Sequence, residues 1–222
     1  MPRLARSVFS NIPHHITQRG NRREDVFFSD EGRLLYLELL QHYCKKHKVA
    51  VLAYCLMDNH VHLVLTPETG DDLQKVLKPL HMRYAQYINK INGWKGHLWQ
   101  GRFFSSALDD AYTCSTVRYV ERNPVQANMI NVAEQYRWSS AAYHCGLADS
   151  ALLTPLPQEY KPVSSEEWSD WLALPESKGI IDLINRNIEK GLPCGSDNFI
   201  ARLEVLANRS LQYRPQGRPI NG

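Results

Sequence analysis

The sequence predicts an α+β fold in which an antiparallel sheet carries helices on one or both faces. Short apolar runs typical of strands alternate with longer segments whose apolar residues recur at helical spacing, in the order β-α-β-β-α-β-α. A chain of 222 residues with 43% hydrophobic side chains can bury an ordinary core. One domain, or one domain with a small appendage, is therefore expected.

The first strand and the first helix lie within the first fifty residues. Residues 12–18 (IPHHITQ) alternate well enough to predict a strand, and Gly20 and a polar basic loop follow it. Leucines at helical spacing then predict a helix over residues 30–47, with Asp30 as its N-cap.

A β-hairpin is expected over the next twenty residues. Residues 49–57 are rich in branched and aromatic side chains, which is typical of a buried strand. Asp58 and Asn59 tolerate the backbone angles of a tight turn. Residues 60–66 (HVHLVLT) are therefore expected to form a second strand that pairs with the first.

A long helix is expected over residues 71–91, where apolar residues form one stripe. Asp71 or Asp72 would open this helix. Pro79 lies inside it and is expected to kink it or to split off its first two turns, because proline lacks an amide hydrogen.

A short strand and a further helix complete the expected pattern. The strand is expected at residues 102–108, after a loop rich in Gly and Trp. Asp109 or Asp110 would cap the helix, which is expected to end at residue 122 or 123, just before Pro124.

The chain changes in character beyond about residue 148. A proline-punctuated acidic loop leads to amphipathic segments at 180–188 and 199–206, the second with Ser196 as a plausible N-cap. We therefore expect one domain at residues 1–148 and a mainly helical extension with a basic tail at residues 149–222.

Basic residues are concentrated in stretches that lack acids. Residues 1–23 hold five arginines and residues 73–108 hold six Lys and Arg, with no acid in either stretch. Residues 149–200 carry nine acids against four bases, and the last 22 residues are basic again. This pattern favours a nucleic-acid partner, although a solvated helix face would explain any single stretch. Aromatic residues that could stack on unpaired bases lie among these charges, namely Tyr84, Tyr87, Trp94, Trp99, Phe103 and Phe104.

Cysteine usage and hydropathy predict a cytoplasmic protein. The five cysteines are widely spaced and include no C-x-x-C pair, so neither a disulfide framework nor a thiolate zinc cluster is expected. The longest apolar run, residues 49–57, is too short to cross a membrane, and the basic start lacks the apolar segment of a secretion signal.

His60 and His62 are the first residues that indicate chemistry. Strand residues i and i+2 point to the same face, so the two imidazoles would stand side by side, close enough to share a metal ion. Val61 would then point into the core. A closed zinc site is not expected, since no third His or Cys follows at zinc spacing. Two half-exposed polar strand residues are the alternative interpretation.

Tyr119 and Asn123 form a second candidate pair. They are helix positions i and i+4, which share one face. A phenol with a pKa of about 10 is a weak nucleophile unless a metal, a base or positive charge favours the phenolate. Tyr112 is the rival nucleophile, since it lies on the same face seven residues earlier. In the alternative interpretation, Tyr119 is a core residue and Asn123 merely ends the helix.

Five sequence blocks, in order, resemble the HUH single-tyrosine transposases, in the branch associated with repetitive extragenic palindromes. The blocks span about residues 8 to 143 and read IPHHITQRGN, LMDNHVHLVL, HLWQGRFFSS, RYVERNPVQAN and YRWSS. The tripeptide GRP near the end of the chain also fits the pattern. Five blocks in order are far more specific than the His-Val-His strand alone.

The resemblance implies a ferredoxin-like or RRM-like antiparallel sheet with a metal site and a nucleophilic tyrosine. Mg²⁺ or Mn²⁺ would be bound by His60, His62 and Asn123, and Tyr119 would attack DNA. Family members cut single-stranded DNA near hairpins, form a 5′-phosphotyrosine and leave a free 3′-OH. Gln126 stands where many relatives have Arg, so weaker phosphate contact is expected there.

Single-stranded or hairpin DNA is therefore the expected partner, and no association with a membrane is expected. The protein is expected to be bacterial and nucleoid-associated in the cytoplasm, as a monomer or a homodimer. The residues expected to contact DNA are Arg19, Arg22, Arg23, Lys90, Lys95, Arg102, Arg118, Arg122, Arg214 and Arg218. Two other functions stay open. One is a non-catalytic binder of hairpin DNA or RNA derived from a transposase, and the other is a phosphoesterase that uses metal-bound water.

Overall fold

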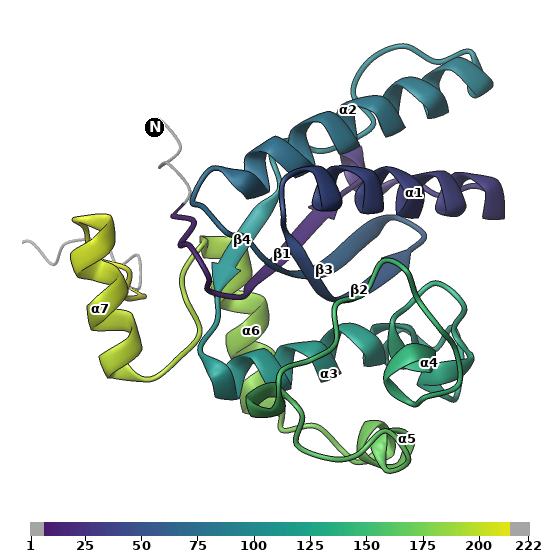
Figure 1. Ribbon diagram of the computed structural model, residues 1–222. Coiled ribbons are helices and arrows are strands. Elements are labelled where there is room, and N and C mark those ends of the chain that lie inside the picture. The colour runs from purple at the N-terminus through teal and green to yellow at the C-terminus, as the bar shows by residue number, and fades with distance from the viewer. Residues whose placement is uncertain (1–6, 214–222) are drawn as a thin grey trace, which may run out of the picture.

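A computed structural model describes residues 7–213 of the chain. Its four strands form one antiparallel sheet in the order β2-β3-β1-β4 (Figure 1). The strands are β1 (His14–Arg19), β2 (Ala50–Met57), β3 (His60–Thr66) and β4 (Phe104–Ala107). This order, with β2 and β3 joined as a hairpin, confirms the ferredoxin-like sheet and the α+β class.

Helices cover both faces of the sheet. The helices α1 (Asp30–Lys46) and α2 (Asp72–Asn92) pack together on one face, and α3 (Asp110–Gln126) lies on the other, against β2 and β3 (Figure 1). Because β2 is covered from both sides, seven of its eight residues are buried. This burial explains why its sequence is continuously apolar rather than alternating.

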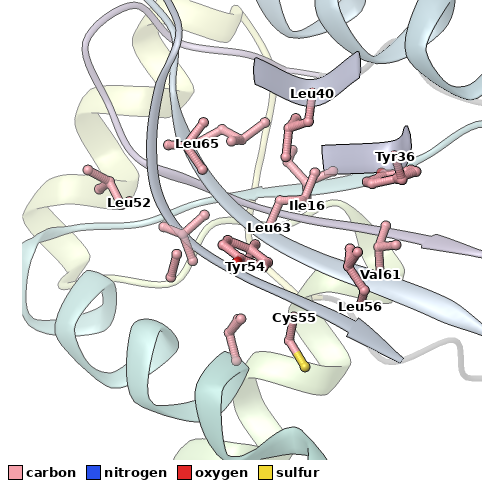
Figure 2. Packing of buried hydrophobic residues seen from close by; sticks show 14 of the residues in the cluster. Ile16, Tyr36, Leu40, Leu52, Tyr54, Cys55, Leu56, Val61, Leu63 and Leu65 are labelled. Carbon is pink, nitrogen blue, oxygen red and sulfur yellow. The ribbon is translucent and has the colours of Figure 1, made fainter. Parts of the chain in front are cut away.

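The two faces of β3 have different roles. Val61, Leu63 and Leu65 are fully buried and point to the face that Tyr36 and Leu40 of α1 cover (Figure 2). Strand alternation therefore sends His60 and His62 to the opposite face, beneath α3. The sequence prediction for this register is confirmed.

Two helix boundaries differ from the predictions. The N-cap of α1 is Ser29, not Asp30, because the Ser29 side chain accepts a hydrogen bond from the Gly32 amide at 3.3 Å. The predicted end of α3 before Pro124 is also wrong, since the helix continues to Gln126. Proline removes a single amide, and the Ala127 amide still bonds to the Asn123 carbonyl at 2.9 Å.

The long helix α2 runs through Pro79 without interruption, so the predicted separation of its first two turns is wrong. Leu73, Val76, Leu77 and Leu80 on either side of the proline are all fully buried. Their burial against the sheet outweighs the missing hydrogen bond, because burying one such side chain contributes about 1.5–3 kcal/mol.

The residues after 126 form short helices and two longer ones. The longer ones flank β4, where the Cys194 amide bonds to the Ala107 carbonyl at 2.8 Å (Figure 1). Ser196 caps the last helix, as predicted. The helices are α4 (Ala141–His144), α5 (Trp168–Ala173), α6 (Lys178–Lys190) and α7 (Asp197–Ala207), with 3-10 turns η1 (Asn21–Arg23), η2 (Ala133–Gln135) and η3 (Gln158–Tyr160). The division of the chain at residue 148 stays a prediction.

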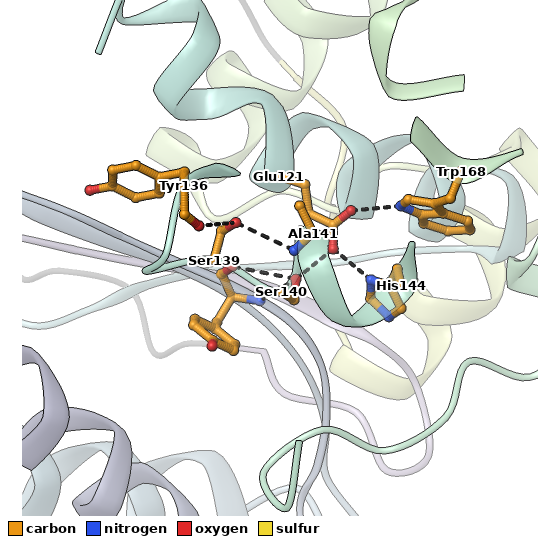
Figure 3. A network of polar contacts seen from close by, with 8 residues as sticks. Glu121, Tyr136, Ser139, Ser140, Ala141, His144 and Trp168 are labelled. Carbon is orange, nitrogen blue, oxygen red and sulfur yellow. Dashed lines mark hydrogen bonds and ion pairs between the residues drawn. The ribbon is translucent and has the colours of Figure 1, made fainter. Parts of the chain in front are cut away.

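A buried carboxylate ties α3 to the segments that follow it. Glu121 is fully buried and accepts hydrogen bonds from Ser140 Oγ at 2.6 Å, His144 Nδ1 at 2.5 Å and Trp168 Nε1 at 2.8 Å (Figure 3). These donors come from the start and end of α4 and from α5. A single side chain therefore joins three segments, as buried charges require.

The described part of the chain, from residue 7 to residue 213, contains no helix that is both long enough and apolar enough to span a membrane.

Candidate active site

His60 and His62 stand side by side on β3, as their spacing predicts. Their ring centroids are 4.8 Å apart, with the ring planes at 77°. His60 is the first residue of the strand, directly after the turn, and His62 is almost completely buried. The pair therefore lies at the end of a central strand, where one ring is more accessible than the other.

The Nδ1 atom of each imidazole is already occupied. His60 Nδ1 bonds to Asn59 Oδ1 at 2.6 Å, and His62 Nδ1 bonds to His15 Nε2 at 2.9 Å. With the proton on Nδ1, the Nε2 lone pair of each ring is available to a ligand. Metal-binding histidines in proteins are typically held in this way, by a partner on the nitrogen that does not bind the metal.

The sequence analysis did not identify His15. It lies on β1, opposite Val64 of β3, and therefore on the same sheet face as His62. The His15 and His62 rings are stacked, with centroids 5.2 Å apart. The signal was present in the alternation of IPHHITQ, but only the strand register reveals which of its two histidines shares a face with His62.

All three imidazoles are neutral at neutral pH. Burial lowers the pKa of His15 to about 3, and burial together with the nearby Arg19 guanidinium lowers the pKa of His60 to about 4. Burial lowers the pKa of His62 well below its usual value, and His60, His15 and Arg19 add to this effect. Neutral imidazoles keep the lone pairs that a cation requires.

Tyr119 projects from α3 onto this histidine cluster. Its ring meets the His62 ring edge-on, with centroids 5.5 Å apart and ring planes at 88°, and lies 5.8 Å from the His15 ring. The histidines lie on the face of β3 that α3 covers, and Tyr119 lies on the face of α3 that is turned towards the sheet. These side chains thus converge within one chain. The ring that lies beside the histidines is that of Tyr119, while the role of either tyrosine as a nucleophile stays a prediction.

The Tyr119 hydroxyl has a partner in α6. It donates a hydrogen bond to Asn185 Oδ1 at 2.7 Å. Burial raises the pKa of Tyr119, a hydrogen bond from Asn123 lowers it, Glu176 raises it and Arg19 lowers it, with a net rise. The phenol is therefore un-ionised at rest. Asn185 was not identified from the sequence, because no local pattern relates it to Tyr119.

Asn123 lies one turn beyond Tyr119, as the helical spacing predicts. Its Nδ2 donates to the Tyr119 carbonyl at 3.2 Å, which leaves the amide oxygen as a possible ligand. In residues 7–213, no group of three or more His, Cys, Asp or Glu side chains is suited to hold a metal ion. Two histidines completed by an amide oxygen would be a different donor set, and its use of Mg²⁺ or Mn²⁺ stays a prediction.

Arg118 and Arg122 are directed towards the segment after α5. Both guanidinium groups donate to the Leu174 carbonyl, and Arg122 also pairs with Glu176 at 3.1 Å. Gln126 donates to the same carboxylate. These contacts attach α3 to the extension, while the contact of both arginines with DNA stays a prediction.

The other basic residues include one that pairs with His60 in the sheet, several exposed ones and two outside the described region. Arg19 sits directly opposite His60 in the sheet and is partly buried. The exposed residues are Arg22, Arg23, Lys90, Lys95 and Arg102. Arg214 and Arg218 lie outside the described residues. The role of all these residues in DNA binding stays a prediction.

Comparison with known proteins assigns the family. The model of IS200-like transposases matches residues 8–123, which is more than half of the 222 residues. The chain belongs to the IS200-like transposase family. The match ends at Asn123 and therefore includes the histidine pair, the tyrosine and the amide of this family member. No curated protein sequence matches the chain.

Solved structures support the fold. The chain is similar to a REP-associated tyrosine transposase bound to a REP hairpin, at 16% identity and a TM-score of 0.53, covering 71% of this chain and 100% of that one. At this identity the likeness shows the fold alone. A transposase structure from Deinococcus radiodurans (17% identity, 54% and 96% covered, TM-score 0.38) is too distant to bear on the argument. The same holds for a bacterial tRNA(His) guanylyltransferase-like protein with GTP (11% identity, 59% and 74% covered, TM-score 0.36).

Proposed function

We propose that this protein cuts and rejoins single-stranded DNA next to hairpins, with Tyr119 as the nucleophile. The observation that carries the proposal is the contact of the Tyr119 ring with His62 on the face where His60 and His62 stand together. Membership in the IS200-like transposase family supports it. The hairpin bound to the similar transposase structure supports the choice of substrate.

The proposed reaction is an in-line displacement at phosphorus. The Tyr119 oxygen forms a bond to the phosphorus and loses its proton, while the bond to the 3′ oxygen breaks and that oxygen is protonated. The product is a 5′-phosphotyrosine with a free 3′-OH. Attack by a 3′-OH reverses the step without ATP, because the tyrosine ester keeps the energy of the phosphodiester.

The residues of the site have distinct parts in this scheme. His60, His62 and Asn123 would hold a divalent cation, which supplies Lewis-acid polarisation of the scissile phosphate when bound. His15 and Asn59 orient the two imidazoles through Nδ1. Because the ring of Tyr119 meets His62 of the same chain, the nucleophile needs no second subunit to reach the histidines.

The test uses the full chain and a hairpin oligonucleotide with a single-stranded flank, labelled 3′ of the expected cut. Incubation with Mn²⁺ is expected to give a labelled covalent protein adduct on a denaturing gel, and EDTA is expected to prevent it. Cleavage without an adduct would point instead to hydrolysis by water. Binding without cleavage would point to a non-catalytic hairpin binder. Either result would overturn the proposal.

Asn185→Ala is expected to accelerate adduct formation by about two- to tenfold near pH 7. This factor corresponds to the net free energy of one hydrogen bond. The Asn185 oxygen accepts from the neutral phenol and so stabilises the protonated form. Without this bond the pKa of Tyr119 falls. The rising limb of the pH–rate profile should then move to lower pH, which single-turnover rates measured from pH 6 to pH 10 would show.

Asn198→Ala is the matched control, since Asn198 is an exposed asparagine on α7. Its pH–rate profile should coincide with that of the wild type. A slower Asn185→Ala enzyme with an unmoved profile would mean that Asn185 orients the phenol and does not restrain its ionisation.

A further inference from the structure

Two loops that are distant in the sequence are joined beside the histidine end of the sheet. The first loop follows β1 and spans residues 20–28, and the second follows α2 and spans residues 93–102. The Asn21 amide bonds to the Leu98 carbonyl at 2.8 Å, and the Gln100 amide bonds to the Arg19 carbonyl at 2.9 Å. The two loops therefore form one surface of fixed shape, here called the paired-loop surface.

This surface is attached to the start of β3, the strand that carries the histidine pair. The Gly20 amide bonds to the Asn59 carbonyl at 2.8 Å, and Asn59 Nδ2 donates to the Arg23 carbonyl at 3.1 Å. Asn59 also holds His60 through its Oδ1 atom. One residue thus connects the paired-loop surface to the histidine pair through hydrogen bonds.

The structure separates the aromatic residues in and near these loops into a buried group and an exposed group. Trp99 is only 9% exposed and donates through Nε1 to the His81 carbonyl at 3.0 Å, and Tyr84 and Phe103 are also buried. These three rings belong to the core and cannot contact a base, so the prediction that they stack on bases is wrong. Trp94 is 49% exposed and Phe28 is 46% exposed.

Trp94 and Phe28 come from different loops and meet on the surface. Their rings pack edge-to-face, with centroids 5.4 Å apart and planes at 82°. Each ring supports the other while a large part of both stays open to water. Exposed aromatic rings held in place in this way present a flat apolar surface at little further entropic cost, which suits a ligand that is itself flat.

The exposed charge of the two loops that carry this ring pair is mostly positive. Exposed bases of the two loops are Arg22, Arg23, Lys95 and Arg102, against the exposed acids Glu24 and Asp25. Arg22 and Arg23 both have positive φ angles, 54° and 64°. Such angles are costly for arginine, and the bonds from Asn59 and the neighbouring loop maintain them. The two loops thus carry four exposed cations together with the two open rings.

We propose that Phe28 and Trp94 form a stacking platform for an unpaired base of the single strand that flanks the hairpin. Stacked bases on aromatic side chains with cations along the backbone are the usual means of holding single-stranded nucleic acid. The inference rests on the proposed function for the presence of single-stranded DNA near the site. It does not depend on Tyr119 chemistry.

The test measures binding alone, in Tyr119→Phe protein so that no adduct forms. A hairpin with a single-stranded flank and the same hairpin without a flank are compared by fluorescence anisotropy. Trp94→Ala is expected to weaken binding of the flanked hairpin by roughly 5- to 100-fold and to leave the unflanked hairpin unchanged. Trp94→Phe should retain most of the affinity, because it keeps a ring.

Phe28→Ala tests the second ring and should give a smaller loss on the same substrate. Leu147→Ala, at another exposed apolar side chain, is the control and should change neither affinity. Equal losses on both hairpins, or an unchanged affinity for the flanked one, would overturn the platform. If the wild-type protein forms no adduct, the proposed function is overturned instead. Failure of the platform and failure of the proposed function are therefore distinguishable.

Discussion

Tyr119→Phe is expected to abolish the covalent protein–DNA adduct, with a fall in rate of at least about a thousandfold, or about 4 kcal/mol of activation free energy. The hydroxyl oxygen is the atom that would bond to phosphorus, and phenylalanine has no atom that can replace it. The substitution leaves the ring in place against His15 and His62. DNA binding should therefore persist.

The folded state of this variant should also persist. The change removes one hydrogen bond, to Asn185, whose net contribution is on the order of 1 kcal/mol. Adduct formation is measured on denaturing gels in Mn²⁺, and binding is measured by anisotropy on the same hairpin. A variant that neither binds nor folds would not be informative, so urea unfolding accompanies both measurements.

Tyr112→Phe is the matched control. Tyr112 lies on the same helix, near its start, where its amide bonds to the Asp109 cap at 3.0 Å. This variant should form the adduct at close to the wild-type rate. An adduct that survives in Tyr119→Phe and disappears in Tyr112→Phe would transfer the nucleophilic role to Tyr112.

Glu121→Ala is expected to lower the free energy of unfolding by about 3–5 kcal/mol, enough to unfold a marginally stable protein. The carboxylate is fully buried and accepts from Ser140, His144 and Trp168 (Figure 3). Alanine would leave three buried donors without their acceptor, and it would also leave a small cavity. Urea unfolding at pH 7 would show a lower midpoint.

Glu121→Gln is the comparison variant. It removes the carboxylate but keeps a side chain of nearly the same shape, so it separates the two contributions to the free energy of unfolding. One amide oxygen could still accept from Ser140 and His144, but the amide nitrogen would face the Trp168 N–H, donor against donor. An intermediate loss of stability is therefore expected. If Glu121→Ala unfolds at the wild-type urea concentration, the network does not hold the three segments together.

The strand predictions succeeded because each strand has a clear local signal. Residues 12–18, 49–57, 60–66 and 102–108 correspond to β1 to β4 within a few residues. The helix ends were less predictable. Pro124 and Pro79 both lie inside helices, because burial of their neighbours compensates for a missing hydrogen bond, and this compensation depends on the packing partner rather than on proline itself.

The aromatic residues of the basic stretch at residues 73–108 also show what the sequence alone cannot predict. Tyr84, Trp94, Trp99 and Phe103 all occur among positive charges, and composition cannot separate those that pack in the core from those that face water. Only Trp94 of these four is exposed, since its loop lies beyond the end of α2. Its partner Phe28 lies in a different loop, so their pairing is not encoded in local sequence.

The sequence by itself determined which residues share a face within one element. His60 and His62 follow from the two-residue period of a strand, and Tyr119 and Asn123 follow from the four-residue spacing of a helix. Local periods say nothing about how one element approaches another. Packing of α3 against the sheet placed the phenol beside His62, strand pairing added His15, and docking of α6 brought Asn185 to the hydroxyl. These contacts join residues 47 to 66 positions apart in the sequence. They form only when the helices and strands pack together, because burial of apolar surface drives that packing.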